Sequence, residues 1–307
     1  LGIAASAVYA NSTTVTPTSA TLYGLVPIDA AATVSSMVIN SASVASASSI
    51  SSLTLSNSSQ ANYQLNVGAN TTPSTNTTNT VSLIPKALTI SSAAVTNKTY
   101  DGTTSASLTG SLSGVQGADA VTLSGLTGTF ATSDVGSGIA VTSSYAITGS
   151  GAANYSLTQP TGLSGSITVK ALTISSPLVT TKVYDGTTSA TLTGTLNGVI
   201  PADTLLVNLS TLSGTYASFN AGSGIAVTPS YAISGTKASN YSLTQPVGMT
   251  GTIATKDLTI SNPLVTTKVY DGTTAAALTG TLNGVIAADA SFVSLSTLTG
   301  TFATANA

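Results

Sequence analysis

The sequence contains no Cys, His, Trp, Arg or Glu, and only 5% of its 307 residues are charged. The absence of cysteine excludes disulfide bonds. The absence of His, Cys, Glu and Arg removes the side chains from which most acid–base, nucleophilic and phosphate-transfer sites are built. A Ser–Lys pair is a nucleophilic arrangement that these residue types still allow. We therefore expect a protein that is not an enzyme and that needs no cofactor.

The few charges are spread thinly along the chain. All the acidic residues are Asp, all the basic residues are Lys, and the net charge is −2. Nucleic-acid binding requires clustered basic side chains, and the sequence has no such cluster. No apolar run approaches the roughly 18 residues that a membrane-spanning helix needs. The sequence therefore predicts neither a nucleic-acid partner nor a membrane span.

Three sequence blocks recur in the same order along the chain. Tyr-Asp-Gly-Thr-Thr begins at Tyr100, Tyr184 and Tyr270, with spacings of 84 and 86 residues. A Lys-Ala/Asp-Leu-Thr-Ile block precedes each of them, and Asn-Tyr-Ser-Leu follows the first two. A fixed period of this length indicates tandem domains. The blocks predict domains at 86–169, 170–255 and 256–307, the last of them incomplete.

Residues 1–85 form a degenerate first copy of the repeat. Tyr9 stands at the Tyr of Tyr-Asp-Gly, and Tyr63 stands at the Tyr of Asn-Tyr-Ser-Leu. The Asn/Thr-rich stretch 66–80 has no counterpart in the other copies and is typical of an exposed loop. The segment Leu1–Ala10 resembles the tail of a signal peptide, but the repeat alignment favours its inclusion in the first domain.

Within each copy, apolar residues alternate with small polar ones. Leu172-Thr173-Ile174 has the period of two that half-buried strands show. Turn residues such as Asp185-Gly186 return about every 8–12 positions, which predicts about seven short strands per repeat. This pattern predicts an all-β chain of tandem immunoglobulin-like β-sandwiches. The stretch Ser166–Ile174 joins two repeats without Gly or Pro, so we expect a stiff, extended rod.

The ordered motifs resemble those of a known repeat family. Lys-x-Tyr-Asp-Gly-Thr-Thr, then Gly-Thr-Phe/Tyr-Ala, then Asn-Tyr-Ser-Leu-x-Gln-Pro is similar to the YDG repeats, relatives of the MBG repeats, in large filamentous-haemagglutinin-like bacterial adhesins. The resemblance covers 86–307, with 1–85 as a decayed copy. It implies a secreted, cell-surface protein with a β-rich stalk. The first copy departs from the pattern because Ala10-Asn11 replaces Asp-Gly, which predicts a different turn there.

The repeated motifs supply the candidate functional residues. Asp-Gly pairs favour tight hairpin turns, and we expect the preceding tyrosine ring to pack beside the turn. The alternative is a calcium site, but one Asp per turn offers few ligands, and no metal site is predicted. In Asn-Tyr-Ser-Leu, the Tyr and Leu are expected to point into the core. The structural repeat motif consists of Tyr100, Asp101, Gly102, Tyr184, Asp185, Gly186, Tyr270, Asp271, Gly272, Asn154, Tyr155, Asn240 and Tyr241.

Two covalent modifications are compatible with the sequence. Asn-x-Ser/Thr triplets are glycosylation acceptors, and the stretch 66–80 is the more plausible place for them. Such triplets begin at Asn11, Asn70, Asn76, Asn154 and Asn240. Isopeptide bonds between Lys and Asn or Asp stiffen some bacterial surface domains, although the absence of Glu removes a proton shuttle. The lysines best placed for this chemistry are Lys98, Lys182 and Lys268.

These observations predict a structural stalk or fibre-forming region of a bacterial adhesin or extracellular matrix protein. Repeats that fold separately and stack in series hold a distal element away from the cell. The alternative is a repeat module that binds glycans or host proteins, although the chain has no Trp to form an aromatic platform. The expected partners are further copies of the same repeat or chain.

The last repeat lacks several of the strands that the other copies are expected to have. Ala307 aligns with Ala221, so the counterparts of Gly224–Val227 and Tyr241–Leu243 are missing. One explanation, which we favour, is that the chain is cut from a longer one. The other is that a neighbouring chain supplies the strands by β-augmentation, which would assemble chains into filaments.

Overall fold

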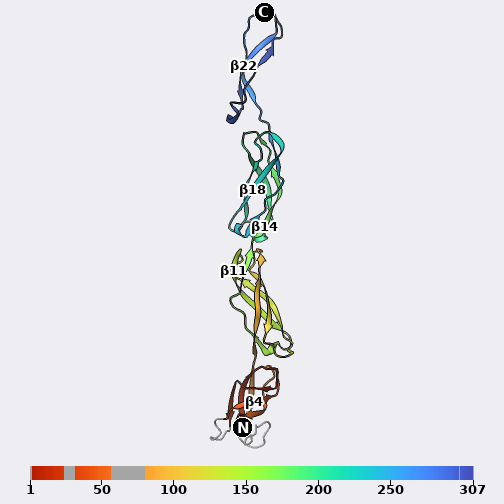
Figure 1. The fold of residues 1–307 in the computed structure, drawn as a ribbon, viewed down its shortest axis with the longest axis vertical. Coiled ribbons are helices and arrows are strands. Elements are labelled where there is room, and N and C mark those ends of the chain that lie inside the picture. Colours follow the sequence, from red (N-terminus) through yellow and green to blue (C-terminus); the bar gives the residue numbers. More distant parts are fainter. Residues whose placement is uncertain (1, 24–31, 57–79, 297, 307) are drawn as a thin grey trace. The chain divides into compact units, whose positions relative to one another are not determined.

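The computed structural model of this protein describes residues 2–23, 32–56, 80–296 and 298–306. These residues fold almost entirely into β-strands and connecting turns, which confirms the predicted all-β class (Figure 1). The helical segments described are three-residue 3₁₀ turns: η3 (Ala152–Asn154), η4 (Pro201–Asp203), η5 (Ala238–Asn240) and η6 (Ala287–Asp289). In the described part of the chain, no helix has the length and hydrophobicity needed to span a membrane.

The chain divides into two compact units, each of which contains two sequence repeats. The first unit consists of Leu1–Thr99 and Thr103–Thr168. The second consists of Tyr100–Gly102 and Val169–Ala307. The first Tyr-Asp-Gly tripeptide therefore packs with the repeat that follows its own.

The described residues of the degenerate first repeat form two three-stranded sheets. β1 lies between β3 and β6, and β4 lies between β2 and β5. Side chains from both sheets, including Ile3, Met37 and Leu83, meet in one hydrophobic core. The strands are β1 (Gly2–Val8), β2 (Thr14–Val15), β3 (Ser19–Tyr23), β4 (Val34–Ile39), β5 (Ile50–Leu55) and β6 (Thr80–Ile84).

β1, at the start of the chain, is the central strand of one of these sheets. Its residues pair antiparallel with β3 and parallel with β6. The predicted loop over 66–80 lies outside the described residues, apart from Thr80 at the start of β6. Tyr63, Asn70 and Asn76 also lie outside them.

The repeat 86–169 has seven strands, as the turn spacing predicts. They form one continuous series of hydrogen-bonded neighbours in the order β12-β7-β9-β10-β11-β13-β8. The strands are β7 (Lys86–Thr96), β8 (Lys98–Thr99), β9 (Ser105–Ser113), β10 (Thr122–Phe130), β11 (Gly136–Thr148), β12 (Tyr155–Leu157) and β13 (Ser164–Thr168).

The repeat 170–255 has the same seven strands in the same order, β19-β14-β16-β17-β18-β20-β15. The series is continuous because long strands change partner along their length. In β14, Lys170–Leu172 pairs parallel with β19, and the rest of the strand pairs antiparallel with β16. The strands are β14 (Lys170–Val179), β15 (Lys182–Val183), β16 (Ser189–Asn197), β17 (Asn208–Tyr216), β18 (Gly222–Ser234), β19 (Tyr241–Leu243) and β20 (Thr250–Ala254).

The predicted alternation of apolar and polar residues matches the burial of the strands. In β16, Ala190 and Leu192 are buried while the residues beside them in the sequence are exposed. Successive side chains of a strand point to opposite faces, so every second residue enters the core. Ala190 and Leu192 meet Tyr216 and Tyr231 there.

The last repeat contributes one three-stranded sheet, in the order β21-β22-β23. Its strands are β21 (Thr259–Val265), β22 (Ala275–Asn283) and β23 (Thr299–Thr301). These strands correspond to the first half of the seven-stranded repeats. Ile260 on β21 is exposed, whereas its counterpart Ile174 on β14 is buried.

The side-chain amide of the Gln in Asn-Tyr-Ser-Leu-x-Gln-Pro makes the hydrogen bonds that the backbone of a neighbouring strand would otherwise make. The Tyr231 N–H donates to Gln245 Oε1 at 2.9 Å, and Gln245 Nε2 donates to the Tyr231 carbonyl at 2.8 Å. Gln159 makes the same two bonds to Tyr145 in the preceding repeat. The motif thus pairs backbone groups that would otherwise be left without a partner beside the core.

We expect Gln245→Ala to destabilise the repeat 170–255 by about 1–3 kcal/mol, since it leaves two backbone groups of Tyr231 unpaired. Hydrogen exchange of the Tyr231 amide, followed by mass spectrometry or NMR, measures this loss. The Tyr145 amide, which keeps Gln159, is the internal control. Unchanged protection at Tyr231 would contradict the role assigned to Gln245.

Candidate functional site

The Tyr-Asp-Gly motif is a bend between two strands that are not neighbours in the sheet. In the repeat 170–255 it links β15, which pairs with β20, to β16, which pairs with β14 and β17. The predicted hairpin is therefore wrong, because the short strand before the motif pairs with the last strand of its repeat. The positive φ expected at the glycine of the turn is confirmed. Gly102, Gly186 and Gly272 have φ values of 77°, 76° and 72°, in the left-handed region that favours glycine.

The first copy keeps this conformation without a glycine, contrary to the different turn expected there. Asn11 occupies the glycine position with a φ of 50°. Asn is among the few residues with a Cβ that adopt left-handed backbone conformations readily. The Tyr9 N–H also donates to the Ile84 carbonyl, just as the Tyr184 N–H donates to Ala254. The alignment of Tyr9 with Tyr184 is therefore confirmed.

A lysine and the Asp of the motif hold the bend in place. Lys182 Nζ lies 2.7 Å from Asp185 Oδ1 and donates to the Thr187 carbonyl at 2.9 Å. The Thr187 N–H also donates to Asp185 Oδ1 at 2.9 Å. The hydrogen bond from Lys182 lowers the pKa of Asp185 to about 2, helped by the bonds from Thr187. Lys268 and Asp271 form the same clamp in the last repeat, where the pKa of Asp271 is also lowered to about 2.

These contacts bear on whether the motif forms an isopeptide bond or binds a metal ion. Lys98 likewise donates to the backbone and side chain of Thr103, so all three candidate lysines brace a bend. An isopeptide bond from Lys182 to Asp185 would require the neutral carboxylic acid, whereas the lowered pKa of Asp185 keeps this group ionised. Within the described residues, no three acidic side chains gather in a way that would hold a metal ion.

The tyrosine of the motif turns away from its own bend and docks on the following repeat. Tyr100 donates its hydroxyl to Asp203 Oδ2 at 2.7 Å, and Tyr241 donates to the same oxygen at 2.8 Å. Asp203 ends η4, and its exposed fraction is 4%. A buried carboxylate is costly unless hydrogen bonds compensate it. Two tyrosine hydroxyls supply that compensation here, and one comes from the preceding repeat.

The two tyrosine rings also pack against each other. The centroids of Tyr100 and Tyr241 lie 5.3 Å apart at an interplanar angle of 79°, an edge-to-face arrangement that aromatic pairs favour. The Tyr241 hydroxyl in turn accepts the Ile200 N–H at 3.2 Å. The Cβ that an alanine would place at Gly102 would lie 2.5 Å from Ile200 Cδ1. The glycine of the motif thus gives the following repeat room to approach.

The first compact unit contains the same joint between its two repeats. Tyr9 and Tyr155 donate to Asp119 Oδ2 at 2.7 and 2.6 Å, and their ring centroids lie 5.2 Å apart. A further bond crosses this joint, since the Val44 N–H donates to Asn154 Oδ1 at 2.9 Å. We call each such set of a docked tyrosine, an aspartate and a second tyrosine a tyrosine–aspartate joint.

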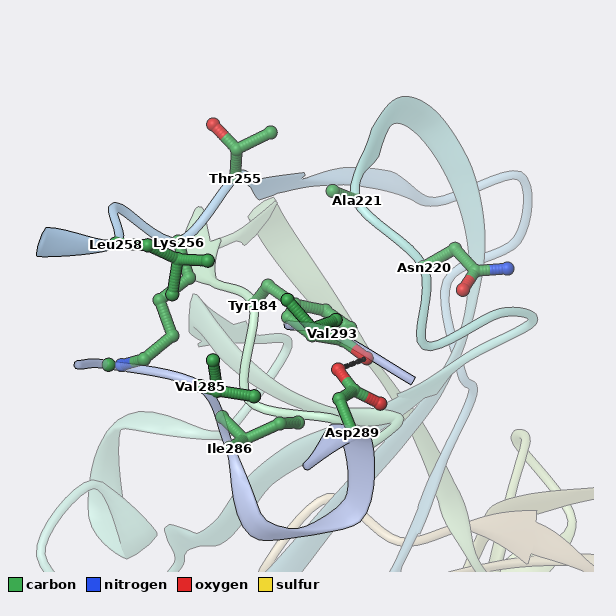
Figure 2. A pocket seen from close by; sticks show the side chains of 11 residues that line it. Tyr184, Asn220, Ala221, Thr255, Lys256, Leu258, Val285, Ile286, Asp289 and Val293 are labelled. Carbon is green, nitrogen blue, oxygen red and sulfur yellow. Dashed lines mark hydrogen bonds between the residues drawn. The ribbon is translucent and has the colours of Figure 1, made fainter. Parts of the chain in front are cut away.

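A third docked tyrosine is present, but its surroundings are incomplete. Tyr184 donates to Asp289 Oδ2 at 2.7 Å, shown as the dashed line in Figure 2. Gly186 again faces an isoleucine, because a Cβ added at Gly186 would lie 2.6 Å from Ile286 Cδ1. Tyr270, the last tyrosine of the series, is 65% exposed.

The joints raise the pKa of their tyrosines. Burial and then the Asp119 carboxylate raise the pKa of Tyr9 to about 12. Burial raises the pKa of Tyr241 to about 12, with Asp203 adding to the effect. The pKa of Tyr100 is raised further for the same two reasons. The hydroxyls therefore stay protonated and able to donate at neutral pH.

The structure distributes the candidate residues over two roles. The aspartates and glycines of the motif shape the bend, and the tyrosines form the joints. Asn154 and Asn240 are buried at the end of a 3₁₀ turn, which supports a structural role for them over glycosylation. Tyr155 and Tyr241 are buried as predicted, and their hydroxyls lie in the joints.

The sequence interpretation missed the acceptors Asp119, Asp203 and Asp289. A signal was available, because they recur at the same spacings of 84 and 86 residues as the tyrosines of the motif. Each acceptor lies more than one repeat period after its tyrosine, with separations of 110, 103 and 105 residues.

Comparison with protein families finds the YDG domain over residues 84–162, 168–248 and 254–307. These matches cover more than half of the chain and begin two residues before each predicted repeat. Residues 1–83, which make up most of the degenerate first copy, lie outside the matched ranges. Comparison with curated proteins and with solved structures found no match.

We expect Tyr9→Phe to loosen the joint of the first unit without unfolding either repeat. The variant keeps the ring and removes one hydrogen bond to a carboxylate, which contributes about 1.5–3 kcal/mol. Exchange of the Val44 amide, which bonds across the joint, should accelerate roughly tenfold to a hundredfold. Tyr145→Phe is the matched control, because its hydroxyl bonds to Thr109 within its own repeat. Equal rates of hydrogen exchange at the Val44 amide in both variants would contradict the role of the Tyr9 hydroxyl in the joint.

The raised pKa values predict an alkaline limit to joint stability. A group whose pKa is raised on folding stabilises the folded state fully below its unfolded pKa, here 10.0, and loses that contribution as the pH passes the folded value. We therefore expect the joints to weaken between pH 10.0 and about 12. Phenolate absorbance during an alkaline titration measures this.

Asp119→Asn should move the titration of Tyr9 and Tyr155 to lower pH, since it removes the carboxylate charge while burial remains. Asp271→Asn, at an exposed bend, should leave the late-titrating tyrosines unchanged. A titration in which both variants coincide with the unaltered chain would refute the electrostatic coupling.

Proposed function

Since the chain belongs to the YDG domain family, we propose that it is a structural stalk region of a bacterial surface adhesin or extracellular matrix protein. The tyrosine–aspartate joint carries this proposal. A tyrosine hydroxyl donates to an aspartate of the following repeat three times, and two of these contacts form a complete joint. A linkage repeated in this way serves mechanical continuity better than a single active or binding site does.

The joint supports a proposal about the form of the stalk. The repeats 86–169 and 170–255 have seven strands each, in keeping with immunoglobulin-like sandwiches. β6 and β7 are separated by a single residue, Pro85, and β13 and β14 by Val169. Short connections and a docked tyrosine both restrict hinge motion. We propose that the repeats form a stiff, extended rod outside the cell.

The burial of the aromatic residues favours a stalk over a module that binds glycans. Carbohydrate sites commonly present exposed aromatic rings. Seven of the tyrosines in the described part of the chain are buried: Tyr9, Tyr100, Tyr145, Tyr155, Tyr216, Tyr231 and Tyr241. We likewise propose a non-catalytic role, because the chain has no His, Cys, Glu or Arg with which to build most active sites.

The proposed partners are further YDG repeats, in the same polypeptide or in neighbouring chains. Only 5% of the residues are charged, so little electrostatic repulsion opposes association of chains. We propose that strand addition between neighbouring chains extends the assembly into filaments.

The stiffness of a joint can be tested with spin labels. The chain has no cysteine, so Ser52→Cys and Thr127→Cys, both exposed, place one label on each repeat of the first unit. We expect a narrow distance distribution by pulsed electron paramagnetic resonance. Tyr9→Ala should broaden it, because truncating a buried aromatic residue costs about 3–5 kcal/mol.

Tyr270→Ala is the control, since this exposed tyrosine belongs to no joint in the described part of the chain. A broad distribution in the unaltered chain would overturn the proposed stiff stalk. So would a distribution that Tyr9→Ala leaves unchanged. Specific binding of the unaltered chain to a glycan array would favour the binding-module alternative.

A further inference from the structure

The chain enters and leaves each seven-stranded repeat at opposite ends. In the repeat 170–255, antiparallel pairing links β14 to β16, β16 to β17, β17 to β18 and β18 to β20. These reversals bring β20 back to the direction of β14, and β15 runs parallel to β20. The strands of the repeat 86–169 alternate in the same way. Because the repeat begins with β14 and ends with β20, a pull on its two ends acts along these strands.

A parallel pair of strands holds each of these two ends. At the entry, β14 pairs with β19, with Lys170 opposite Tyr241. At the exit, β20 pairs with β15, with Ala254 opposite Val183. The Tyr184 N–H adds a further bond beside this second pair, since it donates to the Ala254 carbonyl at 2.9 Å. The first and last strands are therefore both held by neighbours that run in their own direction.

The degenerate first repeat also has such a pair beside the tyrosine of its motif. Residues 4–8 of β1 pair parallel with residues 80–84 of β6. The Tyr9 N–H then donates to the Ile84 carbonyl at 2.9 Å, while its hydroxyl donates to Asp119 of the next repeat. The tyrosine thus connects the last strand of its own repeat to the tyrosine–aspartate joint.

The direction of a pull decides how a pair of strands separates. When the adjacent ends of an antiparallel hairpin are pulled apart, the hydrogen bonds are loaded one after another and the pair unzips. When two parallel strands are pulled from opposite ends, the force acts along both strands and loads all the bonds between them together. The chain from β14 into β15 is pulled from its beginning, and β20 is pulled from its end. The pair β15–β20 is therefore loaded in shear.

A buried side chain also bridges the first and last strands of the repeat 170–255. The Tyr216 hydroxyl donates to the Thr252 carbonyl of β20 at 3.2 Å and lies 3.5 Å from the Thr180 carbonyl, directly after β14. Gly251 lets β20 come this close, because a Cβ added there would lie 2.6 Å from Val179 Cγ1 on β14. The bridge therefore resists the same sliding motion as the parallel pairs.

The repeat 86–169 bridges the same strands with a different side chain. Phe130 stands at the place of Tyr216 and has no hydroxyl. Instead, Asn97 lies between β7 and β8 and accepts the Ser166 N–H of β13 on its Oδ1 at 2.8 Å. The contact between the first and last strands is thus kept although the residues that make it differ.

We propose that each seven-stranded repeat is a tension-bearing unit, which yields to a pull along the chain only when its first and last strands slide past each other. The parallel pairs at the two ends resist this sliding, and the side-chain bridges of Tyr216 and Asn97 reinforce them. The inference rests on the proposed stalk function for its biological meaning, because a stalk transmits a pull along its chain. The mechanical property itself belongs to a single repeat.

Single-molecule force spectroscopy on the whole chain can test this, with pairs of engineered cysteines as attachment points because the sequence has none of its own. Val169→Cys and Thr255→Cys, both exposed, load the repeat 170–255 at its entry and exit. Leu205→Cys and Thr236→Cys, also exposed, instead load the open end of the antiparallel pair β17–β18. We expect a several-fold higher unfolding force in the first geometry, since shear loads the bonds together.

Tyr216→Phe measures the contribution of the bridge. We expect the fold to tolerate this change, because Phe130 occupies the same place in the repeat 86–169. Forced unfolding reports the unfolding rate. Loss of one hydrogen bond should raise that rate roughly threefold to tenfold in the entry-to-exit geometry. Tyr231→Phe is the matched control, because its hydroxyl bonds to Thr193 on β16, away from the first and last strands, and should leave the rate unchanged.

Equal unfolding forces in the two pulling geometries would overturn the inference, and this comparison needs no change in the core. An effect of Tyr216→Phe no larger than that of Tyr231→Phe would also overturn it. Neither result alters the distance distribution between labels at Ser52 and Thr127, which measures the stiffness of the joint in the other unit. Failure of the tension-bearing repeat and failure of the stiff stalk are therefore distinguishable.

Discussion

The hydrogen bond from a tyrosine hydroxyl to an aspartate of the next repeat is the interaction on which the architecture depends. Asp203 is almost completely buried, and a buried carboxylate without compensation would destabilise the repeat that contains it. Its two hydrogen-bond donors come from two repeats, Tyr100 from the preceding one and Tyr241 from its own. Full stabilisation of one repeat thus requires its neighbour.

The Tyr-Asp-Gly bend positions that tyrosine for its contact with the next repeat. The clamp of Lys182 on Asp185 and Thr187 fixes the direction in which the chain leaves β15. The positive φ of Gly186 lets the backbone turn, and its missing Cβ leaves space for Ile286. Aspartate therefore has two separate roles in these repeats. In the bend it is exposed and paired with lysine, and in the joint it accepts tyrosine hydroxyls.

Coupling between nearest neighbours gives a tandem chain properties that a single domain lacks. Stability is then shared between each repeat and its interfaces, so terminal repeats differ from internal ones.

The sequence alone determined the tandem repetition, the β class, the seven strands of each complete repeat and the left-handed glycine of the motif. These features follow from local chemistry: the period of two, the spacing of turn residues, and the low steric cost of a positive φ at glycine. Even the degenerate first copy could be aligned through Tyr9.

Only the tertiary structure decided which groups meet. The motif was expected to close a hairpin, but β15 pairs with the distant β20, and no local rule specifies such a partner. The acceptor aspartates were overlooked because each lies more than one hundred residues from its tyrosine, across a repeat boundary. Spacing revealed that these residues recur, whereas their contact depends on how one folded repeat packs on the next.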